Sequence, residues 1–317
     1  MTAAIAIHGG AGAIERSKLG ADGYEATLRS LAEALRAGWS HLAAGASAVD
    51  AVEAAVIALE DDPLFNAGRG ACFNADGLHE FDAAIMDGRT LSAGAVAACR
   101  TVRNPVRAAR SVMDHTRHVL LVGEAADAFA AAEGLPQEPQ SYFHTDRQWS
   151  HLERARARAA GRQSGTATDA ERHGTVGAVA RDRDGHLAAA TSTGGMTNKR
   201  PGRVGDTPLI GAGTYARDGI CAVSCTGSGE DFIRACASHT VAARIAYGGD
   251  TLAAAAHATL HDDIVAHGGG GGLIAVGADG GITMPYSSAG MYRGAIDTAG
   301  RMTVAIYDER HEISLSQ

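Results

Sequence analysis

Glycine is the residue that most limits how this chain can fold. The 317 residues include 41 glycines and only 7 prolines, and the glycines stand in short clusters between hydrophobic runs. Such clusters are typical of tight turns and of places where a ligand must approach the backbone closely. Aromatic residues make up only 5% of the chain, so alanine, valine, leucine and isoleucine must build the core.

Composition excludes several classes of protein. With 28 Lys+Arg against 36 Asp+Glu, the formal net charge is −8, which argues against a nucleic-acid-binding protein with a basic face. No apolar run approaches the roughly 18–20 residues needed to cross a bilayer, and MTAAIAIHGG lacks the pattern of a signal peptide. Five scattered cysteines do not suggest a disulfide scaffold. We therefore expect a cytoplasmic protein without nucleic-acid or membrane partners.

Hydrophobic spacing predicts an α+β protein with strands and helices in both halves. In the first half we expect a strand over 4–8 entering a glycine turn, helices over 23–44 and from Ser47 to Asp61, strands within 64–100, and helix over 104–134. In the second half we expect a hairpin over 175–192, one helix at about 229–247, and hairpins near 273–287 and 295–307. The segment 153–174 is small, polar and charged, which is typical of a helix end followed by a flexible surface linker.

The predicted hairpin places two threonines opposite each other. If its turn is centred on Asp184, Thr175 at its start faces Thr193 at its end. Thr175 can be an ordinary β-branched strand residue. Alternatively, the chain is cut between Gly174 and Thr175, and the freed α-amine acts as base for the threonine hydroxyl. These residues alone leave both interpretations open.

Three further motifs carry candidate chemistry. The stretch TSTGGMTNK (191–199) is rich in hydroxyls and glycines but lacks the spacing of a phosphate-binding loop. In PGRVGD, Arg203 and Asp206 can form a surface salt bridge, or they can clamp the carboxylate and ammonium of an amino acid. The glycine turn in CTGSGE is either a tight connection or an oxyanion hole made by the Thr226 hydroxyl and the Gly227 N–H.

Together with three motifs upstream, these features resemble the plant-type L-asparaginase and isoaspartyl aminopeptidase family. Its members are N-terminal-nucleophile hydrolases that cleave themselves before a threonine. The resemblance spans nearly the whole chain and is weakest from about 140 to 172. The matching segments are 8–12 (HGGAG), 65–70 (FNAGRG), 81–88 (FDAAIMDG), 173–177 (HGTVG), TSTGGMTNK, PGRVGD and CTGSGE.

The resemblance implies a role for individual residues. Thr175 matches the nucleophile and Gly174–Thr175 the cleavage site, while Thr193 matches a supporting threonine and Asn66 an asparagine near the nucleophile. Thr226 and Gly227 match the oxyanion hole. The substrate-binding set is Arg203, Val204, Gly205, Asp206, Thr226, Gly227, Ser228 and Gly229. A structural sodium ion is implied on the backbone carbonyls of Leu59, Glu60, Asp62, Phe65, Ala67 and Arg69.

The family also implies the reaction and the architecture. Thr175 would attack the β-carboxamide of L-asparagine, or the isopeptide carbonyl of a β-aspartyl dipeptide, and water would then hydrolyse the ester, without a cofactor for catalysis. The expected fold is a four-layer αββα sandwich in one N-terminal-nucleophile domain. It would mature into subunits 1–174 and 175–317, and two copies would pair as an (αβ)₂ dimer.

Four alternatives compete with this interpretation. A glycosylasparaginase would have Asp before the threonine, where this chain has Gly174, and a threonine endopeptidase would have a long insertion. A third alternative is an amino-acid-binding homologue that never matures. The fourth is a metal hydrolase using His115 and His118, although no H-E-x-x-H pattern is present. The glycine run 268–272 is expected to be a flexible turn.

Overall fold

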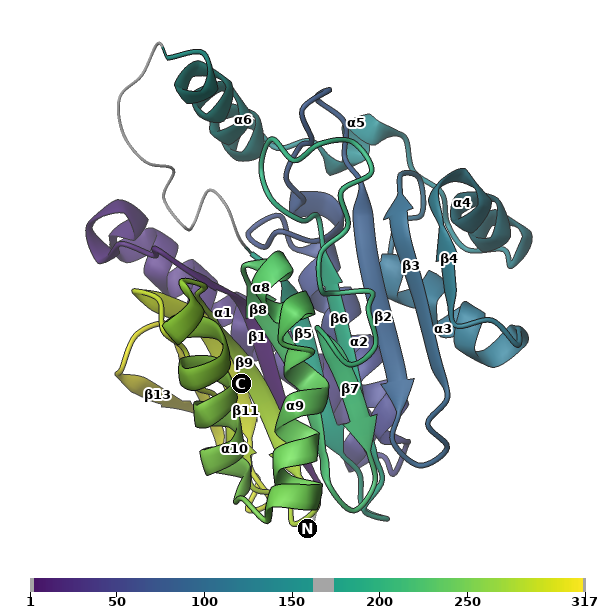
Figure 1. The fold of residues 1–317 in the computed structure, drawn as a ribbon, viewed down its shortest axis with the longest axis vertical. Helices are drawn as coiled ribbons and strands as arrows, with labels where there is room; N and C mark the ends of the chain where they lie inside the picture. The colour runs from purple at the N-terminus through teal and green to yellow at the C-terminus, as the bar shows by residue number, and fades with distance from the viewer. Residues whose placement is uncertain (1–2, 162–173, 316–317) are drawn as a thin grey trace.

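Two β-sheets packed face to face form the centre of the molecule, and helices lie outside them (Figure 1). The computed structural model describes residues 3–161 and 174–315. The nine strands of the large sheet are, in spatial order, β13 (Arg310–Ile313), β12 (Met302–Ala305), β11 (Gly290–Ile296), β1 (Ala4–Gly12), β5 (Val176–Arg181), β6 (Leu187–Thr193), β2 (Phe81–Asp87), β3 (Ala93–Cys99) and β4 (Leu120–Val122). The small sheet has the order β10 (Ile282–Thr283), β9 (Gly271–Gly277), β8 (Cys221–Gly227) and β7 (Thr214–Arg217).

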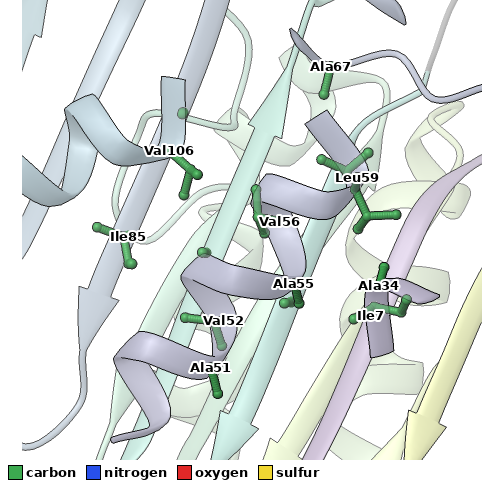
Figure 2. Close-up of a cluster of buried hydrophobic side chains, with 14 of the residues drawn as sticks. Ile7, Ala34, Ala51, Val52, Ala55, Val56, Leu59, Ala67, Ile85 and Val106 are labelled. Atoms are coloured by element: carbon green, nitrogen blue, oxygen red, sulfur yellow. The ribbon is translucent and has the colours of Figure 1, made fainter. Parts of the chain in front are cut away.

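Three hydrophobic clusters separate four layers. In β1, Ile5 and Ile7 face the helices of the large sheet, whereas Ala4 and Ala6 face the small sheet, as the two-residue period of a strand requires. Figure 2 shows the outer cluster, in which Val52 and other residues of a helix lie over the sheet. The space between the sheets is lined largely by small side chains, and a third cluster joins the small sheet to its own helices. The expected αββα sandwich is confirmed.

The helices fall into the two outer layers and one flanking group. Those packed on the large sheet are α1 (Arg16–Ala43), α2 (Ala48–Asp61), α3 (Pro105–His115) and α4 (Gly123–Ala132). Two more follow them in the chain, α5 (Gln140–Phe143) and α6 (Asp146–Ala159). On the small sheet lie α8 (Gly229–Arg234), α9 (Ala237–Ala243) and α10 (Leu252–Ala258).

The local signals that are chemically specific are borne out. Ser47 caps α2 by accepting a hydrogen bond from the N–H of Asp50 at 3.2 Å, and the helix ends at Asp61, two residues before a proline. In the hairpin β5–β6, Val176 pairs with Ser192, which is the register expected from a turn centred on Asp184. Asp182 holds this turn by accepting from the N–H groups of Asp184 and His186.

Several expected boundaries are wrong, and at Gly9 the reason is a tertiary contact. The segment 9–12 is no turn: β1 continues through Gly12, with a bulge between His8 and Gly10. A Cβ on Gly9 would lie 2.4 Å from a ring carbon of Phe65, so glycine allows a close contact inside a strand. The single helix expected over 229–247 is broken at Cys236, whose φ is 45°, and β4 interrupts the segment 104–134.

Other differences concern the segments that looked least regular. Within 64–80, only a short helix at Gly68–Gly70 and a bridge from Asn74 to Lys199 are regular. The helical residues of 251–267 were not expected. Of the linker 153–174, the part up to Ala159 completes α6, and 162–173 lies outside the described residues. In the described part of the chain, no helix is long and apolar enough to span a bilayer.

Candidate active site

Thr175 lies immediately before β5, in the interior of the protein. Its side chain is buried, and its Oγ1 donates a hydrogen bond to Oγ1 of Thr193 at 3.2 Å. The hairpin brings them together, since Thr193 ends β6 where β5 begins. The predicted pair of threonines is therefore present.

The carbonyl group of Gly174 is held by two donors. Nδ2 of Asn66 donates to its oxygen at 2.7 Å, and Oγ1 of Thr193 donates to the same oxygen at 3.0 Å. Asn66 is itself fixed, because its Oδ1 accepts from the N–H of Cys72 at 2.7 Å and its Nδ2 also donates to Gly195. Two fixed donors on one carbonyl oxygen are the arrangement that stabilises negative charge when a nucleophile attacks the carbon.

The glycines of β1 pass directly beside this peptide bond. A Cβ on Gly10, whose φ is +113°, would lie 3.0 Å from Cα of Gly174 and 3.2 Å from N of Thr175. The next residue, Ala11, donates its N–H to Oγ1 of Thr226 at 3.3 Å. Because this hydroxyl accepts from Ala11, its own hydrogen can still be donated to a substrate. β1 thus brings the predicted cleavage site and the predicted oxyanion donor Thr226 to one place.

Two cavities adjoin the glycine strand. One, of about 100 Å³, is lined by Asn66 and Gly174 among others; the second, of about 260 Å³, is lined by Gly227, Ser228 and part of the glycine run 268–272. Both are lined by Ala11 and Gly12, so they flank the same stretch of β1. The glycine run is not simply a flexible turn: its last two residues belong to β9 and pair with Gly227 and Thr226.

Arg203 and Asp206 approach each other at Gly229, the first residue of α8. A Cβ added to Gly229 would lie 2.9 Å from Nη2 of Arg203 and 3.0 Å from Oδ1 of Asp206. A single point is therefore within contact distance of a guanidinium and a carboxylate, with no side chain of Gly229 to fill it. Gly205 lies on the same group, since its Cβ would be 3.0 Å from Nη1 of Arg203.

The salt bridge of Arg203 is made with Glu230 rather than with Asp206. Nε and Nη2 donate to the two carboxylate oxygens of Glu230 at 2.9 and 2.7 Å. The interpretation of Arg203 and Asp206 as a mutual surface salt bridge is therefore wrong. Val204, the remaining residue of this loop in the predicted set, is partly buried. Ser228 donates its N–H to Gly270 at 3.0 Å, which fixes the start of α8.

Asp206 is a buried carboxyl group whose charge would be stabilised by a cation. It is 4% exposed, and burial raises its pKa to about 7, against the opposing effect of hydrogen bonding and of Arg203. Its Oδ2 has no hydrogen-bond partner within the described residues. Burying a carboxylate without a partner is unfavourable, and an ammonium group would supply one.

The loop expected to bind sodium follows the C-terminal end of α2, which is the negative end of the helix dipole. Its carbonyls of Asp62 and Ala67 each accept one backbone hydrogen bond, from Phe65 and Gly70, and each keeps a second lone pair. Pro63 has no N–H to donate to the carbonyl of Leu59, and the N–H of Leu64 donates to Oδ1 of Asp62. The loop is also tight, because a Cβ on Gly68 would lie 2.4 Å from O of Glu60 and one on Gly70 would lie 2.1 Å from O of Phe65. Oxygen ligands without charge suit a hard cation, so the residues present fit the group.

The side chain of Glu60 links this loop to the strand that carries Thr193. Its Oε1 accepts from Oγ of Ser192 at 2.6 Å and from the N–H of Val106 at 3.0 Å. Complete burial raises the pKa of Glu60 to about 8.

The two histidines considered as metal ligands are His115 and His118. His115 pairs with Glu133, and no group of three His, Cys, Asp or Glu side chains that could hold a metal occurs among residues 3–161 and 174–315. The metal-hydrolase alternative therefore has no supporting cluster there.

Two residues of the site are not indicated by their motifs. Glu230 is part of CTGSGE, but only the folded loop brings it to Arg203, 27 positions away. His8 opens HGGAG, and its Nδ1 lies 2.8 Å from O of Thr175, 167 positions away. A buried histidine at the end of an apolar strand was the available signal for His8, but nothing local identifies its partner.

Comparison with known proteins agrees with this geometry. The profile of a family described as asparaginase matches residues 1–306. The isoaspartyl peptidase of Salmonella typhimurium is 50% identical over 97% of this chain and 99% of its own. That of Escherichia coli is 48% identical over 99% of both chains. The human isoaspartyl peptidase/L-asparaginase is 46% identical over 74% of each chain. This chain therefore belongs to the family of asparaginases and isoaspartyl peptidases that its motifs resemble.

Proposed function

We propose that this protein hydrolyses L-asparagine and the isopeptide bond of β-aspartyl dipeptides, with Thr175 as an N-terminal nucleophile. The names of its relatives support both substrates. The two bacterial relatives, matched over nearly their full length, are isoaspartyl peptidases, and the human relative, matched over 74% of its length, is an isoaspartyl peptidase/L-asparaginase. The observation that carries the proposal is the contact set around Gly174. Its carbonyl oxygen accepts from Asn66 and Thr193, while the hydroxyl of Thr175 lies on Thr193.

The first step is cleavage of the chain. Oγ of Thr175 attacks the carbonyl carbon of Gly174. The C–N bond then breaks as the departing nitrogen takes up the proton of the hydroxyl, which gives an ester between the two residues and a free amine on Thr175. Asn66 and Thr193 stabilise the oxyanion formed on Gly174. Water then hydrolyses the ester, leaving Gly174 with a carboxylate and Thr175 with a free α-amine and hydroxyl. This amine has the intrinsic pKa of a chain terminus, about 7.7–8.0, and is a suitable base near neutral pH.

The second reaction uses the same hydroxyl on a substrate. Arg203 binds the α-carboxylate and Asp206 the α-ammonium, which leaves the β-carbonyl to face Thr175. The α-amine takes the proton from Oγ as it attacks, and Thr226 and Gly227 stabilise the oxyanion. Ammonia or an amino acid leaves with a proton, and water hydrolyses the β-aspartyl ester to release aspartate. A glycosylasparaginase-like amidase and a non-maturing binding homologue remain the alternatives that experiment must exclude.

The test is to follow the intact mass and the activity of the same samples. We expect wild-type protein to separate under denaturing conditions into 1–174 and a fragment that begins at Thr175, and then to hydrolyse both substrates. Thr175→Ala should remain one chain of 317 residues without activity. A variant that is still cleaved between Gly174 and residue 175 would contradict the assignment. A wild-type chain that never splits would favour the binding homologue, and activity on glycosylated asparagine alone would favour the amidase.

We also propose that the carbonyls of Leu59, Glu60, Asp62, Phe65, Ala67 and Arg69 hold a sodium ion that stabilises this loop. The ion would have a structural role, because the loop adjoins Asn66 and, through Glu60, the strand of Thr193. Transfer from sodium to choline chloride at equal ionic strength should lower the midpoint of thermal unfolding, and added sodium should restore it. Equal midpoints in the two salts would contradict the site.

The proposal also covers the oligomeric state and the cellular location of the protein. We propose that two processed molecules associate as an (αβ)₂ dimer, which light scattering on eluted protein would test. We further propose that the protein works in the cytoplasm. All five cysteines are free, and four of them are buried, which suits a reducing compartment.

A further inference from the structure

His8 is a buried ionisable group that the proposed reaction does not use. It lies on β1 and is fully buried, at a position that continues the alternation of Ala4 and Ala6 toward the small sheet. Nδ1 lies 2.8 Å from the carbonyl oxygen of Thr175, and Nε2 lies 2.8 Å from Oγ of Ser224 on β8. The imidazole therefore joins the backbone of the nucleophile to the opposite sheet.

The partners of His8 determine its tautomer. A carbonyl oxygen can only accept, so Nδ1 carries the hydrogen and donates to Thr175. Burial lowers the pKa of His8 to about 3, so the ring is neutral at working pH and Nε2 is an acceptor. The hydroxyl of Ser224 consequently donates to Nε2.

The same direction of donation continues between the sheets. Oγ1 of Thr191 on β6 lies 2.8 Å from Oγ of Ser224, and Oγ1 of Thr214 on β7 donates to Thr191 at 2.7 Å. Because the Ser224 hydrogen is directed to His8, Thr191 must donate to Ser224. We call the residues Thr214, Thr191, Ser224 and His8 the interlayer chain. From Thr191 onward its donors point toward the carbonyl of Thr175, whereas the hydroxyl of Thr214 has a second acceptor, the carbonyl oxygen of Thr207 at 3.1 Å.

The surroundings show that the fold makes room for this chain. A Cβ on Gly177 would lie 2.0 Å from Oγ of Ser224 and 2.5 Å from Nε2 of His8. Around it the interlayer is built mainly from alanine and other apolar side chains. Buried polar groups in such a layer are costly unless each is hydrogen-bonded. The interlayer chain supplies these hydrogen bonds, and from Thr191 through Ser224 and His8 they run in one direction, ending at Thr175.

We propose that His8 is a positioning residue that fixes the carbonyl of Thr175 and thereby orients the nucleophile. This inference rests on the proposed function, in which Thr175 becomes a chain terminus. A terminal residue loses its covalent restraint on one side and frays unless it is tied down. Rotation about its Cα–C bond moves the α-amine and Oγ relative to the rest of the site, and a donor on the carbonyl oxygen limits that rotation.

Kinetics should separate this role from substrate binding. The hydrogen bonds made by the side chains of the interlayer chain involve neither Arg203 nor Asp206. Loss of the donor should therefore lower kcat and the rate of self-cleavage while KM stays close to the wild-type value. Misplacement of a reacting group by about 1 Å can cost roughly 100-fold in rate, so we expect a loss of about 10- to 100-fold.

The decisive comparison is His8→Asn against His8→Gln. The amide nitrogen of asparagine is attached to Cγ, as is Nδ1 of histidine, so His8→Asn can still donate to Thr175. The amide of glutamine lies one bond further out, near the position of Nε2, and contacts Ser224 instead. We expect His8→Asn to retain most of the wild-type kcat and rate of self-cleavage. His8→Gln, although its side chain is the larger of the two, should lose both. The KM of both variants should stay close to the wild-type value.

A second pair of variants covers the case in which the His8 variants do not fold. Ser224→Ala removes the hydroxyl that holds Nε2 of His8, so the ring is no longer fixed from the small sheet, and the variant should lower kcat at constant KM. Ser238→Ala is the matched control, because Ser238 is fully buried on α9 and its hydroxyl has no partner among the described residues. It should keep wild-type kcat. Thermal unfolding of each variant reports stability separately from rate.

The outcomes are distinct. Equal kcat in folded His8→Asn and His8→Gln, or wild-type kcat in Ser224→Ala, would overturn the role of His8. If the wild-type protein itself neither splits nor hydrolyses either substrate, the proposed function fails first, and the comparison of variants has no activity to measure.

Discussion

Gly229 leaves open the one point that both charged groups of the substrate clamp can reach. We expect Gly229→Ala to reduce kcat/KM by at least about tenfold, mainly through KM, because its methyl group would occupy this point beside Arg203 and Asp206. Self-cleavage should proceed, since Gly174 is held by Asn66 and Thr193 instead.

Steady-state kinetics and intact mass on the same sample check this expectation. Gly248→Ala is the control, because a Cβ there meets nothing within 4 Å. Wild-type KM in Gly229→Ala would remove the clamp from the mechanism.

Asp206 should make binding of an amino acid depend on pH. Its pKa of about 7 means that the carboxyl group of the free enzyme becomes protonated below this pH. It then loses the negative charge that attracts the ammonium group of an amino acid. We expect the affinity for L-aspartate, the product, to fall about tenfold between pH 8 and 6. Calorimetric titration from pH 8 to 6 measures it, and succinate, which lacks the ammonium group, is the control. Parallel curves for the two ligands would contradict the prediction.

At this scale, sequence and structure agree where chemistry is local. Thr175, Arg203 and Asp206 can be proposed as site residues, because hydroxyls, charges and glycines cluster in short motifs and these motifs resemble those of the family. His8, Ser224 and Glu230 cannot, because their roles depend on partners that only the fold brings near. The pairing of Arg203 with Glu230 instead of Asp206 is such a case: three-residue spacing does not determine which carboxylate a guanidinium meets.

At the scale of secondary-structure elements, the packing of α1 against α2 depends on one glycine. A Cβ on Gly38 would lie 2.5 Å from Cδ1 of Ile5 and 2.8 Å from O of Ala51. We expect Gly38→Ala to lower the free energy of unfolding by about 1–3 kcal/mol through overpacking. Gly23→Ala, in the same helix, meets nothing closer than Leu19 at 3.4 Å and should raise it by up to about 1 kcal/mol.

Both substitutions should be measured by denaturant unfolding in the Thr175→Ala background, in which unfolding involves one chain. A loss of stability in Gly23→Ala equal to that in Gly38→Ala would contradict the prediction, because it would show that the close contact at Gly38 does not account for the loss.

The secondary structure can be predicted where a signal is complete within the element. The cap at Ser47 and the register of β5–β6 are of this kind. Glycines inside β1 look like a turn because the sequence does not show that Phe65 packs on them. The left-handed backbone of Cys236 similarly breaks a helix at a residue that has no breaker's signature.

In the molecule as a whole, the two predicted halves are interleaved in one sheet. β1 belongs to the first half, but it pairs with β11 on one side and β5 on the other, and β2 pairs with β6. Composition predicts mixed helix and strand but not this order, which follows from pairings between distant segments. The four-layer architecture was expected only through the family resemblance.

We expect cleaved protein to remain one particle. Because three strand pairings join residues 1–174 to 175–317, size-exclusion chromatography under native conditions should give a single peak that contains both fragments. Denaturing electrophoresis of that peak should show both. Elution of a separate fragment without denaturant would contradict the prediction.

Because β1 inserts between two strands of the other half, refolding should depend on whether the chain has already been cleaved. An uncut chain can bring β1 into its gap as part of one folding reaction, with loop closure inside a single molecule. Two separated fragments must instead find each other, and the fragment 175–317 has a vacant slot in its sheet, with exposed strand edges, until they do. The rate at which denatured, cleaved protein regains its native structure should therefore fall when the protein is diluted. The refolding rate of Thr175→Ala, which remains one chain, should not. Cutting after folding preserves a structure that the pieces would assemble only with difficulty.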